Sequence, residues 1–219
     1  MNVVIRNATD KDKAFVINSI IEAEKSGGAN ASYCNLFDIF DADLRILLDQ
    51  ILDESMEGQE ICLEHFLIAE VNGTPAGAVS AWVEKANDMA SNMIKSNLFM
   101  FFVNREKLLG AATKMKLLSE IGIERDDKAL QIECVYTAEP FRGKGITKML
   151  IDEHINRANL NGSDFNKVQV ILLGNNVNAR KAYEKAGFVT IKEKNCADNA
   201  ILSILPYNSK ILMEKQINK

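Results

Sequence analysis

The chain has 219 residues, a formal net charge of -4, 47% hydrophobic residues and 26% charged residues. This is the composition of a globular protein with a hydrophobic core, and the charge balance favours neither nucleic acid nor an anionic membrane surface as a partner. No stretch approaches the roughly 20 apolar residues of a membrane span, and the amino terminus lacks a signal-peptide pattern. The four cysteines are scattered, so we expect reduced thiols, no metal site and a cytoplasmic location.

In the amino-terminal half, short β-like runs alternate with helical patterns. Strands are predicted over residues 3–6, 66–71 and 76–83. The Asn72-Gly73 pair predicts a tight hairpin turn between the last two. Apolar residues at helical spacing predict a helix that starts near Lys11 with Asp10 as its cap, and a second helix over 36–58.

The carboxyl-terminal half begins with a methionine-rich helical pattern over residues 86–123. We interpret it as two helices, or one helix and a loop, packed on a sheet face with the methionines as core filler. Further strands are predicted over 131–137, 168–173, 188–192 and 211–215, and helices over 145–159 and 178–186. No repeat or flexible linker divides the chain, so we expect a single domain over 1–219 with an enlarged amino-terminal helical region.

A basic glycine loop, PFRGKGITKML at residues 140–150, stands between a predicted strand and a predicted helix. The first amides of a helix lack internal partners and carry partial positive charge, so they accept an anion such as a phosphate. Arg142, Lys144 and Lys148 add positive charge there. The spacing fits neither the nucleoside triphosphatase loop nor the dinucleotide-binding fingerprint. A basic turn with glycines for steric relief is the other interpretation.

A second segment, LGNNVNARKAYEKAGF at residues 173–188, follows about thirty residues later. Together the two segments resemble the GNAT superfamily of acyl-CoA-dependent N-acetyltransferases. The resemblance covers roughly residues 131–194, while residues 1–85 agree in element order only. It implies an α/β (α+β) fold with a mixed, mostly antiparallel central sheet of about six or seven strands. That sheet would be splayed at the cofactor site and flanked by helices.

The resemblance also implies a binding site for acetyl-CoA, that is, for its coenzyme A portion. In the family the glycine loop holds the pyrophosphate through backbone amides, and the matching residues here are Arg142, Gly143, Lys144, Gly145, Ile146 and Thr147. Thr147 stands where glycine or alanine is usual, and its hydroxyl could donate to a phosphate. Backbone groups around Val135 and Thr137 match those that hold the pantetheine arm, and Asn178 matches an asparagine near the cofactor.

Two residues are candidates for catalysis. Tyr183 matches the tyrosine often placed to protonate the departing thiolate, with core packing as its other interpretation. Glu133 is the candidate general base, or else a charged residue without catalytic duty. Strand alternation predicts Glu133 on the same face as Val135 and Thr137, with Cys134 opposite. His154 is expected to face solvent, and His65 to be a surface or structural residue; we assign catalysis to neither.

The implied function is an N-acetyltransferase that moves an acetyl group from acetyl-CoA to a primary amine by direct transfer in a ternary complex. A non-catalytic acyl-CoA-binding sensor and a nucleotide-phosphate binder are the alternatives. The acceptor would be a small-molecule or peptide amine. The acidic residues over 38–64 would attract a cationic acceptor, or they form a solvated helix face. The acceptor's identity and a homodimer both stay open.

Overall fold

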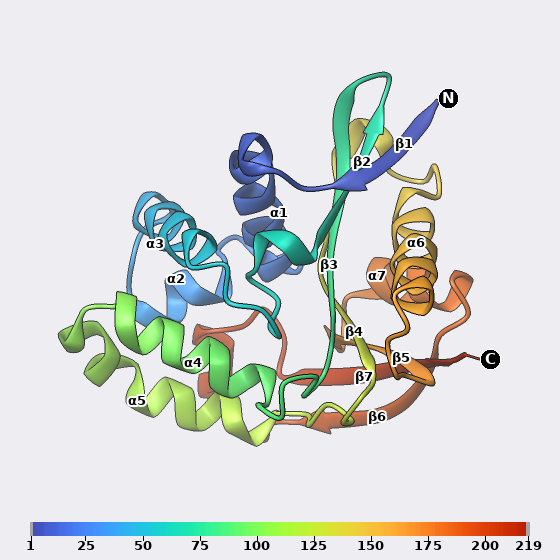
Figure 1. Ribbon diagram of the computed structural model, residues 1–219. Coiled ribbons are helices and arrows are strands. Elements are labelled where there is room, and N and C mark those ends of the chain that lie inside the picture. Colours follow the sequence, from blue (N-terminus) through green and yellow to red (C-terminus); the bar gives the residue numbers. More distant parts are fainter. Residues whose placement is uncertain (1, 218–219) are drawn as a thin grey trace.

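One seven-stranded sheet runs through the centre of the protein in the computed structural model, which describes residues 2–217 (Figure 1). Its strand order is β1-β2-β3-β4-β5-β7-β6, and within the described residues only β4 and β5 pair in parallel. The strands are β1 Val3–Asn7, β2 Phe66–Val71, β3 Thr74–Val83, β4 Leu130–Thr137, β5 Lys167–Leu173, β6 Val189–Asn195 and β7 Ser209–Gln216. The predicted mixed, mostly antiparallel sheet is confirmed.

Helices cover both faces of this sheet. They are α1 Lys13–Lys25, α2 Ser32–Phe37, α3 Asp41–Asp53, α4 Ser91–Phe102, α5 Arg105–Glu120, α6 Ile146–Leu160 and α7 Val177–Lys185. Helices α1 to α5 lie on one side of the sheet, and α6 and α7 lie on the other (Figure 1). Each side has its own hydrophobic core, one around Phe37 and Leu48 and the other around Leu150 and Phe188. Burial on both faces explains why five of the seven residues of β5 are apolar.

The predicted helix over 36–58 is wrong in its extent, because the chain forms two helices there. Asp38 has a φ of +51° and ends α2, and α3 begins at Asp41. Residues 86–123 form two helices, which was one of the two predicted arrangements, but α4 and α5 pack mainly on α3 and α2 rather than on a sheet face.

The methionines of residues 86–123 are not core filler. All four are exposed, at 39–67% of full accessibility: Met89, Met93, Met100 and Met115. The inward positions of α4 are occupied instead by Ile94, Leu98 and Phe99. Composition alone therefore misassigned the buried face of these helices.

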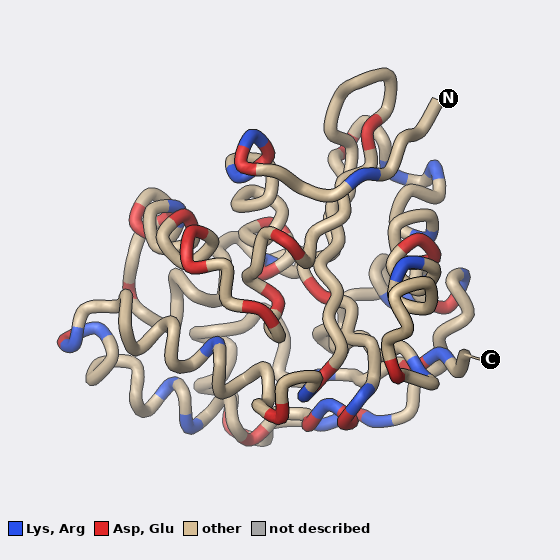
Figure 2. Tube along the Cα trace, viewed as in Figure 1, with Lys and Arg blue, Asp and Glu red and all other residues tan. Residues whose placement is uncertain are grey.

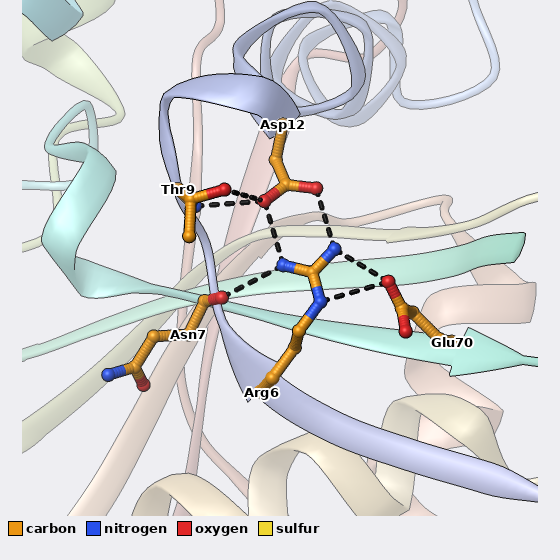
Figure 3. Close-up of polar contacts among 5 residues, drawn as sticks. All are labelled: Arg6, Asn7, Thr9, Asp12 and Glu70. Atoms are coloured by element: carbon orange, nitrogen blue, oxygen red, sulfur yellow. Dashed lines mark hydrogen bonds and ion pairs between the residues drawn. The ribbon is translucent and has the colours of Figure 1, made fainter. Parts of the chain in front are cut away.

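Arg6 ties the first strand to the first helix (Figure 3). Its guanidinium donates to both carboxylate oxygens of Asp12, at 2.7 and 2.8 Å, and to Oε1 of Glu70 on β2, at 2.6 and 2.9 Å. Asp12 also accepts from the backbone N–H and hydroxyl of Thr9. The Arg6 guanidinium lowers the pKa of Asp12 to about 2. Asp12, not the predicted Asp10, is the buried carboxylate at this helix start, and α1 begins at Lys13.

We expect Arg6→Ala to lower the free energy of unfolding by about 3 kcal/mol, because it leaves the buried Asp12 carboxylate without its cation. Urea unfolding at neutral pH measures the loss. Arg45→Ala is the matched control, because Arg45 holds an exposed partner, Asp41, one helical turn away. That variant should lose less than about 0.5 kcal/mol. Equal losses of unfolding free energy in the two variants would show that the ion pairs of Arg6 stabilise the protein no more than an exposed pair does.

Candidate active site

Strands β4 and β5 separate in the middle of the sheet. Their parallel pairing covers three residue pairs and ends at Ile132 and Val170. Beyond that point, the side of β4 that would face β5 has no strand partner, and a cavity of about 170 Å³ lies there. Its lining includes Glu133, Val135 and Tyr183. A gap in the sheet with free backbone groups can orient an extended ligand and polarise a carbonyl.

A β-bulge in β4 sets which side chains face this gap. The register with β3 passes from Ala78–Tyr136 to Ser80–Glu133, so Cys134 and Val135 both lie opposite Val79. Cys134 has a φ of +51°. Cys134 belongs to the core under α1 to α5, whereas Val135 packs against the core under α6.

The prediction that Glu133 shares a face with Val135 and Thr137 is therefore wrong. The extra residue of the bulge shifts the alternation by one position. Thr137 contacts Thr147 of α6, on the α6 side with Val135. Glu133 pairs with Arg125 and lies with Cys134 on the side of the larger helical layer, where both line a second cavity as well.

His154 completes the hydrogen bonding at the bulge. The prediction that it faces solvent is wrong, because only 9% of it is exposed and its Nε2 lies 2.9 Å from the carbonyl oxygen of Val79. A carbonyl only accepts, so Nε2 carries the hydrogen. Burial lowers the pKa of His154 to about 4. His65 is structural as expected: its Nδ1 bonds the Gln59 carbonyl and its ring stacks on Trp82.

The lowered pKa of His154 predicts acid sensitivity. Between pH 6.5 and about 4 the unfolded chain binds a proton that the folded protein does not, so stability falls as pH falls through this window. The expected contribution is about 3 kcal/mol, full above pH 6.5 and lost below pH 4. Urea unfolding at pH 7 and pH 4.5 measures it. His154→Gln, which can still donate to Val79 but does not titrate, should lose less stability on acidification than the parent protein.

The glycine loop is open to a ligand. Gly143 and Gly145 have φ values of +75° and +80°, a region that favours glycine, and a Cβ on either would meet no atom within 4 Å. Within residues 2–217, the backbone N–H groups of Gly143, Lys144 and Gly145 have no hydrogen-bond partner. The first turn of α6, beginning at Ile146, adds its own free amides.

The side chains of the loop are mostly engaged with the loop itself. Arg142 Nε donates to the Thr137 carbonyl at 3.1 Å, and Lys144 Nζ donates to the Pro140 carbonyl at 2.8 Å. The Thr147 hydroxyl lies 3.2 Å from that of Thr137, so it already has a partner on β4. Within residues 2–217, the backbone amides and the two Nη groups of Arg142 are thus the parts of this loop left for an anion.

Helix α6 approaches the sheet closely beside the loop. A Cβ on Gly77 of β3 would lie 2.8 Å from Cγ2 of Ile146 and 3.0 Å from the Tyr136 carbonyl oxygen. Glycine at this position therefore lets the first turn of α6 pack closely against β3 and β4.

Tyr183 and Glu133 meet at the smaller cavity. Tyr183 is 5% exposed, its ring packs on Phe188 with centroids 5.8 Å apart, and its hydroxyl has no hydrogen-bond partner among the described residues. Burial, with the nearby Glu133, raises the pKa of Tyr183, so the phenol keeps its proton at neutral pH. Burial also raises the pKa of Glu133, and the charge of Arg125 at 2.8 Å opposes that rise.

Asn178 does not reach the cavity. It is exposed on the first turn of α7, and the asparagine that lines the cavity is Asn176. Asn176 accepts from the Ala179 N–H at 3.2 Å and caps α7. The assignment of Asn178 to the cofactor stays a prediction, as does a role for Val135 and Thr137 with the pantetheine arm.

A second, larger cavity of about 540 Å³ adjoins the first and shares Glu133 and Cys134 with it. Six charged residues from six separate segments line it, namely Glu24, Glu60, Lys95, Arg125, Glu133 and Lys210. Glu133 was predicted as a site residue and Glu60 belongs to the acidic segment 38–64, whereas the other four form no motif and were not predicted. A sequence signal exists only for Lys95, which is the one charged residue in α4.

The acidic segment over 38–64 is mostly exposed to solvent. This agrees with its interpretation as a solvated helix face. Figure 2 shows acidic positions along α3 and on the segment that follows it. Asp41, Asp43, Asp49 and Asp53 are exposed, whereas Glu60 is buried and lines the larger cavity. In the part of the chain that the structure describes, there is no cluster of three or more potential metal ligands. None of its helices is long and apolar enough to cross a membrane.

Comparisons with known proteins agree with this geometry. The family model of the acetyltransferase (GNAT) domain matches residues 78–208, more than half of the chain. The fold is similar to that of a solved acetyltransferase, with TM-score 0.62, 19% identity and coverage of 98% of this chain and 100% of that one. An N-acetyltransferase from Staphylococcus aureus Mu50 aligns with TM-score 0.60, 17% identity and coverage of 96% and 99%. Among curated proteins, no sequence match was found.

A third solved structure is yncA from Salmonella typhimurium with its cofactor acetyl-CoA, with TM-score 0.54, 14% identity and coverage of 100% of this chain and 96% of that one. The family match settles the class: this chain belongs to the GNAT acetyltransferase family. It is an acyltransferase that uses acetyl-CoA. The open loop with free amides fits a diphosphate, which Gly143, Lys144, Gly145 and the first turn of α6 would hold.

Proposed function

We propose that this protein is an N-acetyltransferase that transfers the acetyl group of acetyl-CoA directly to a primary amine. The observation that carries the proposal is the cavity at the gap between β4 and β5, which both Glu133 and Tyr183 line. Bound acetyl-CoA supplies a thioester, whose C–S bond breaks as the amide N–C bond forms. The residues around the cavity would supply the proton transfers that this exchange needs.

Glu133 is the proposed general base. An amine attacks only when it is neutral, and a carboxylate whose pKa is raised by burial is better suited to take its proton near neutral pH. Tyr183 is the proposed general acid, which gives its proton to the sulfur that leaves. The proton that Glu133 takes up returns to solvent in the next turnover.

Direct transfer is favoured over a covalent enzyme intermediate. Cys134 is the cysteine that lines both cavities, and burial raises its pKa well above the ordinary value. The thiol therefore stays protonated and is a poor nucleophile. The four cysteines are free thiols. Their state supports a cytoplasmic location, which is part of the proposal.

The test is release of free thiol from acetyl-CoA across a library of amines, peptides and amino compounds. The proposal expects turnover with at least one amine and formation of the N-acetyl product by mass spectrometry. Tight binding of coenzyme A without turnover on any acceptor would instead support the alternative, a non-catalytic acyl-CoA sensor. Stronger protection from heat by ATP than by coenzyme A would favour a nucleotide binder.

A further inference from the structure

The larger cavity is placed to hold the acceptor. It lies between the layer of α1, α2, α4 and α5 and the strands β4, β5 and β7, and Glu133 and Cys134 line both it and the smaller cavity. A molecule in the larger cavity would therefore have one end at the proposed reaction point. Its volume of about 540 Å³ lies within the usual range for small-molecule sites.

The charges that line this cavity cancel. Three residues are acidic and three are basic, namely Glu24, Glu60, Glu133, Lys95, Arg125 and Lys210. A lining with separated but balanced charges complements a ligand that carries both signs. A simple cation or a simple anion would leave part of the lining opposed by a like charge or without a partner.

The internal pairing of these residues leaves particular atoms free. Arg125 Nη2 donates to Glu133 Oε1 at 2.8 Å, Lys95 bonds Glu60, and Glu24 accepts from Ser32. Arg125 Nη1, Glu133 Oε2 and Lys210 Nζ have no hydrogen-bond partner within residues 2–217.

Two cationic donors, Arg125 Nη1 and Lys210 Nζ, are therefore available near one anionic acceptor, Glu133 Oε2. The Arg125 guanidinium is held from another side by the Trp82 ring, 5.4 Å away. Lys210 interacts electrostatically with both Arg125 and Glu133. Arg125 and Glu133 are themselves in contact, at 2.8 Å. A ligand ammonium bound to Glu133 and a ligand carboxylate bound to Arg125 must therefore also lie close to each other. One shared carbon atom between the two ligand groups satisfies this requirement.

An aromatic cluster forms the apolar part of the wall. The rings of Tyr33 and Phe99 lie 4.8 Å apart, and those of Phe37 and Phe99 lie 5.3 Å apart. All three line the cavity and are buried. Their surface suits an apolar or aromatic side chain of the ligand.

We propose that the acceptor is a free α-amino acid with an apolar or aromatic side chain, bound in the larger cavity. Its amino group lies at Glu133, and its carboxylate lies at Arg125 and Lys210. This inference rests on the proposed N-acetyltransferase function and names its substrate class. The bond changes are those given above: the amino nitrogen forms the amide bond, Glu133 takes its proton, and coenzyme A leaves as the thiol.

The first experiment compares matched ligands on the whole 219-residue chain. The three ligands share a phenyl ring. Phenylalanine carries both an ammonium and a carboxylate, phenethylamine carries only the ammonium, and 3-phenylpropionate carries only the carboxylate. Calorimetry in the presence of coenzyme A measures binding, and thiol release from acetyl-CoA measures turnover. We expect phenylalanine to bind at least about tenfold more tightly than either analogue, and its kcat/KM to exceed that of phenethylamine about 100-fold.

The second experiment removes the lysine. Lys210→Met should raise the KM for phenylalanine about 10- to 100-fold and leave turnover of phenethylamine within a factor of about three. Lys210→Gln serves as a second variant should the methionine disturb folding. Lys192→Met, on the exposed strand β6 and outside the cavity lining, is the matched control and should change neither substrate.

The two proposals fail in different ways. Tighter binding of phenylalanine than of its analogues, without any thiol release, would refute the transferase and keep the ligand assignment. Thiol release with phenethylamine equal to or faster than with phenylalanine would keep the transferase and overturn the amino-acid acceptor. Equal effects of Lys210→Met on both substrates would also overturn it, as would the absence of calorimetric binding by any α-amino acid with an apolar side chain.

Discussion

Tyr183→Phe is expected to lower kcat about 100-fold while leaving the free energy of unfolding within about 1 kcal/mol. The change removes one hydroxyl that has no hydrogen-bond partner among residues 2–217, so no internal hydrogen bond is broken. The ring remains to pack on Phe188. Loss of activity without loss of stability would separate a proton donor from a residue that serves only the core.

The identity of the leaving thiol sharpens this test. If Tyr183 protonates the departing sulfur, an acetyl thioester of a more acidic thiol needs that proton less. The defect of Tyr183→Phe should then shrink markedly with such a donor. Tyr136→Phe is the control: Tyr136 lies on β4, contacts Phe15 edge to face and lines neither cavity. A variant at Tyr183 with full turnover would remove it from the mechanism.

The regular elements of this fold could be predicted from the sequence because their signals are local. Residues 66–71 were predicted as a strand and form β2 with the same bounds, and the Asn72-Gly73 turn follows it. The glycine loop was predicted between a strand and a helix, and it lies between β4 and α6. Alternation, helical spacing and turn chemistry act over a few residues, so they survive without knowledge of the rest of the chain.

The bulge at Cys134 and the charged lining could not be predicted in this way. The bulge depends on how β4 pairs with β3, which lies more than fifty residues earlier in the chain, and no residue of QIECVYT marks it. A one-residue shift was enough to move Glu133 to the other face. Likewise Arg125, in the loop before β4, and Lys210, on β7, line one cavity only because β4 and β7 belong to one sheet with β5 between them. Long-range pairing, rather than local propensity, determines both features.

Glu133→Gln gives the second large effect, an expected fall in kcat/KM of about 100-fold at neutral pH. The amide keeps the size of the side chain and can still accept from Arg125, but it cannot take a proton. Wild-type kcat/KM should rise with pH as the Glu133 carboxyl loses its proton, and burial moves this rise above the ordinary range of a glutamate. The pH–rate profile of both proteins measures the effect.

The profile of the Glu133→Gln variant distinguishes a base from a merely structural carboxylate. Without the base, the enzyme must wait for amine that is already neutral, so its rate should climb about tenfold per pH unit and approach the wild type at high pH. A structural role would instead give a loss that is constant across pH. Glu22, the other carboxylate lining the smaller cavity, is held by Lys25 at 2.7 Å and is the matched comparison. If Glu22→Gln showed the pH-dependent loss and Glu133→Gln did not, the proton acceptor would be Glu22, and the bulge would serve to open the gap rather than to aim Glu133.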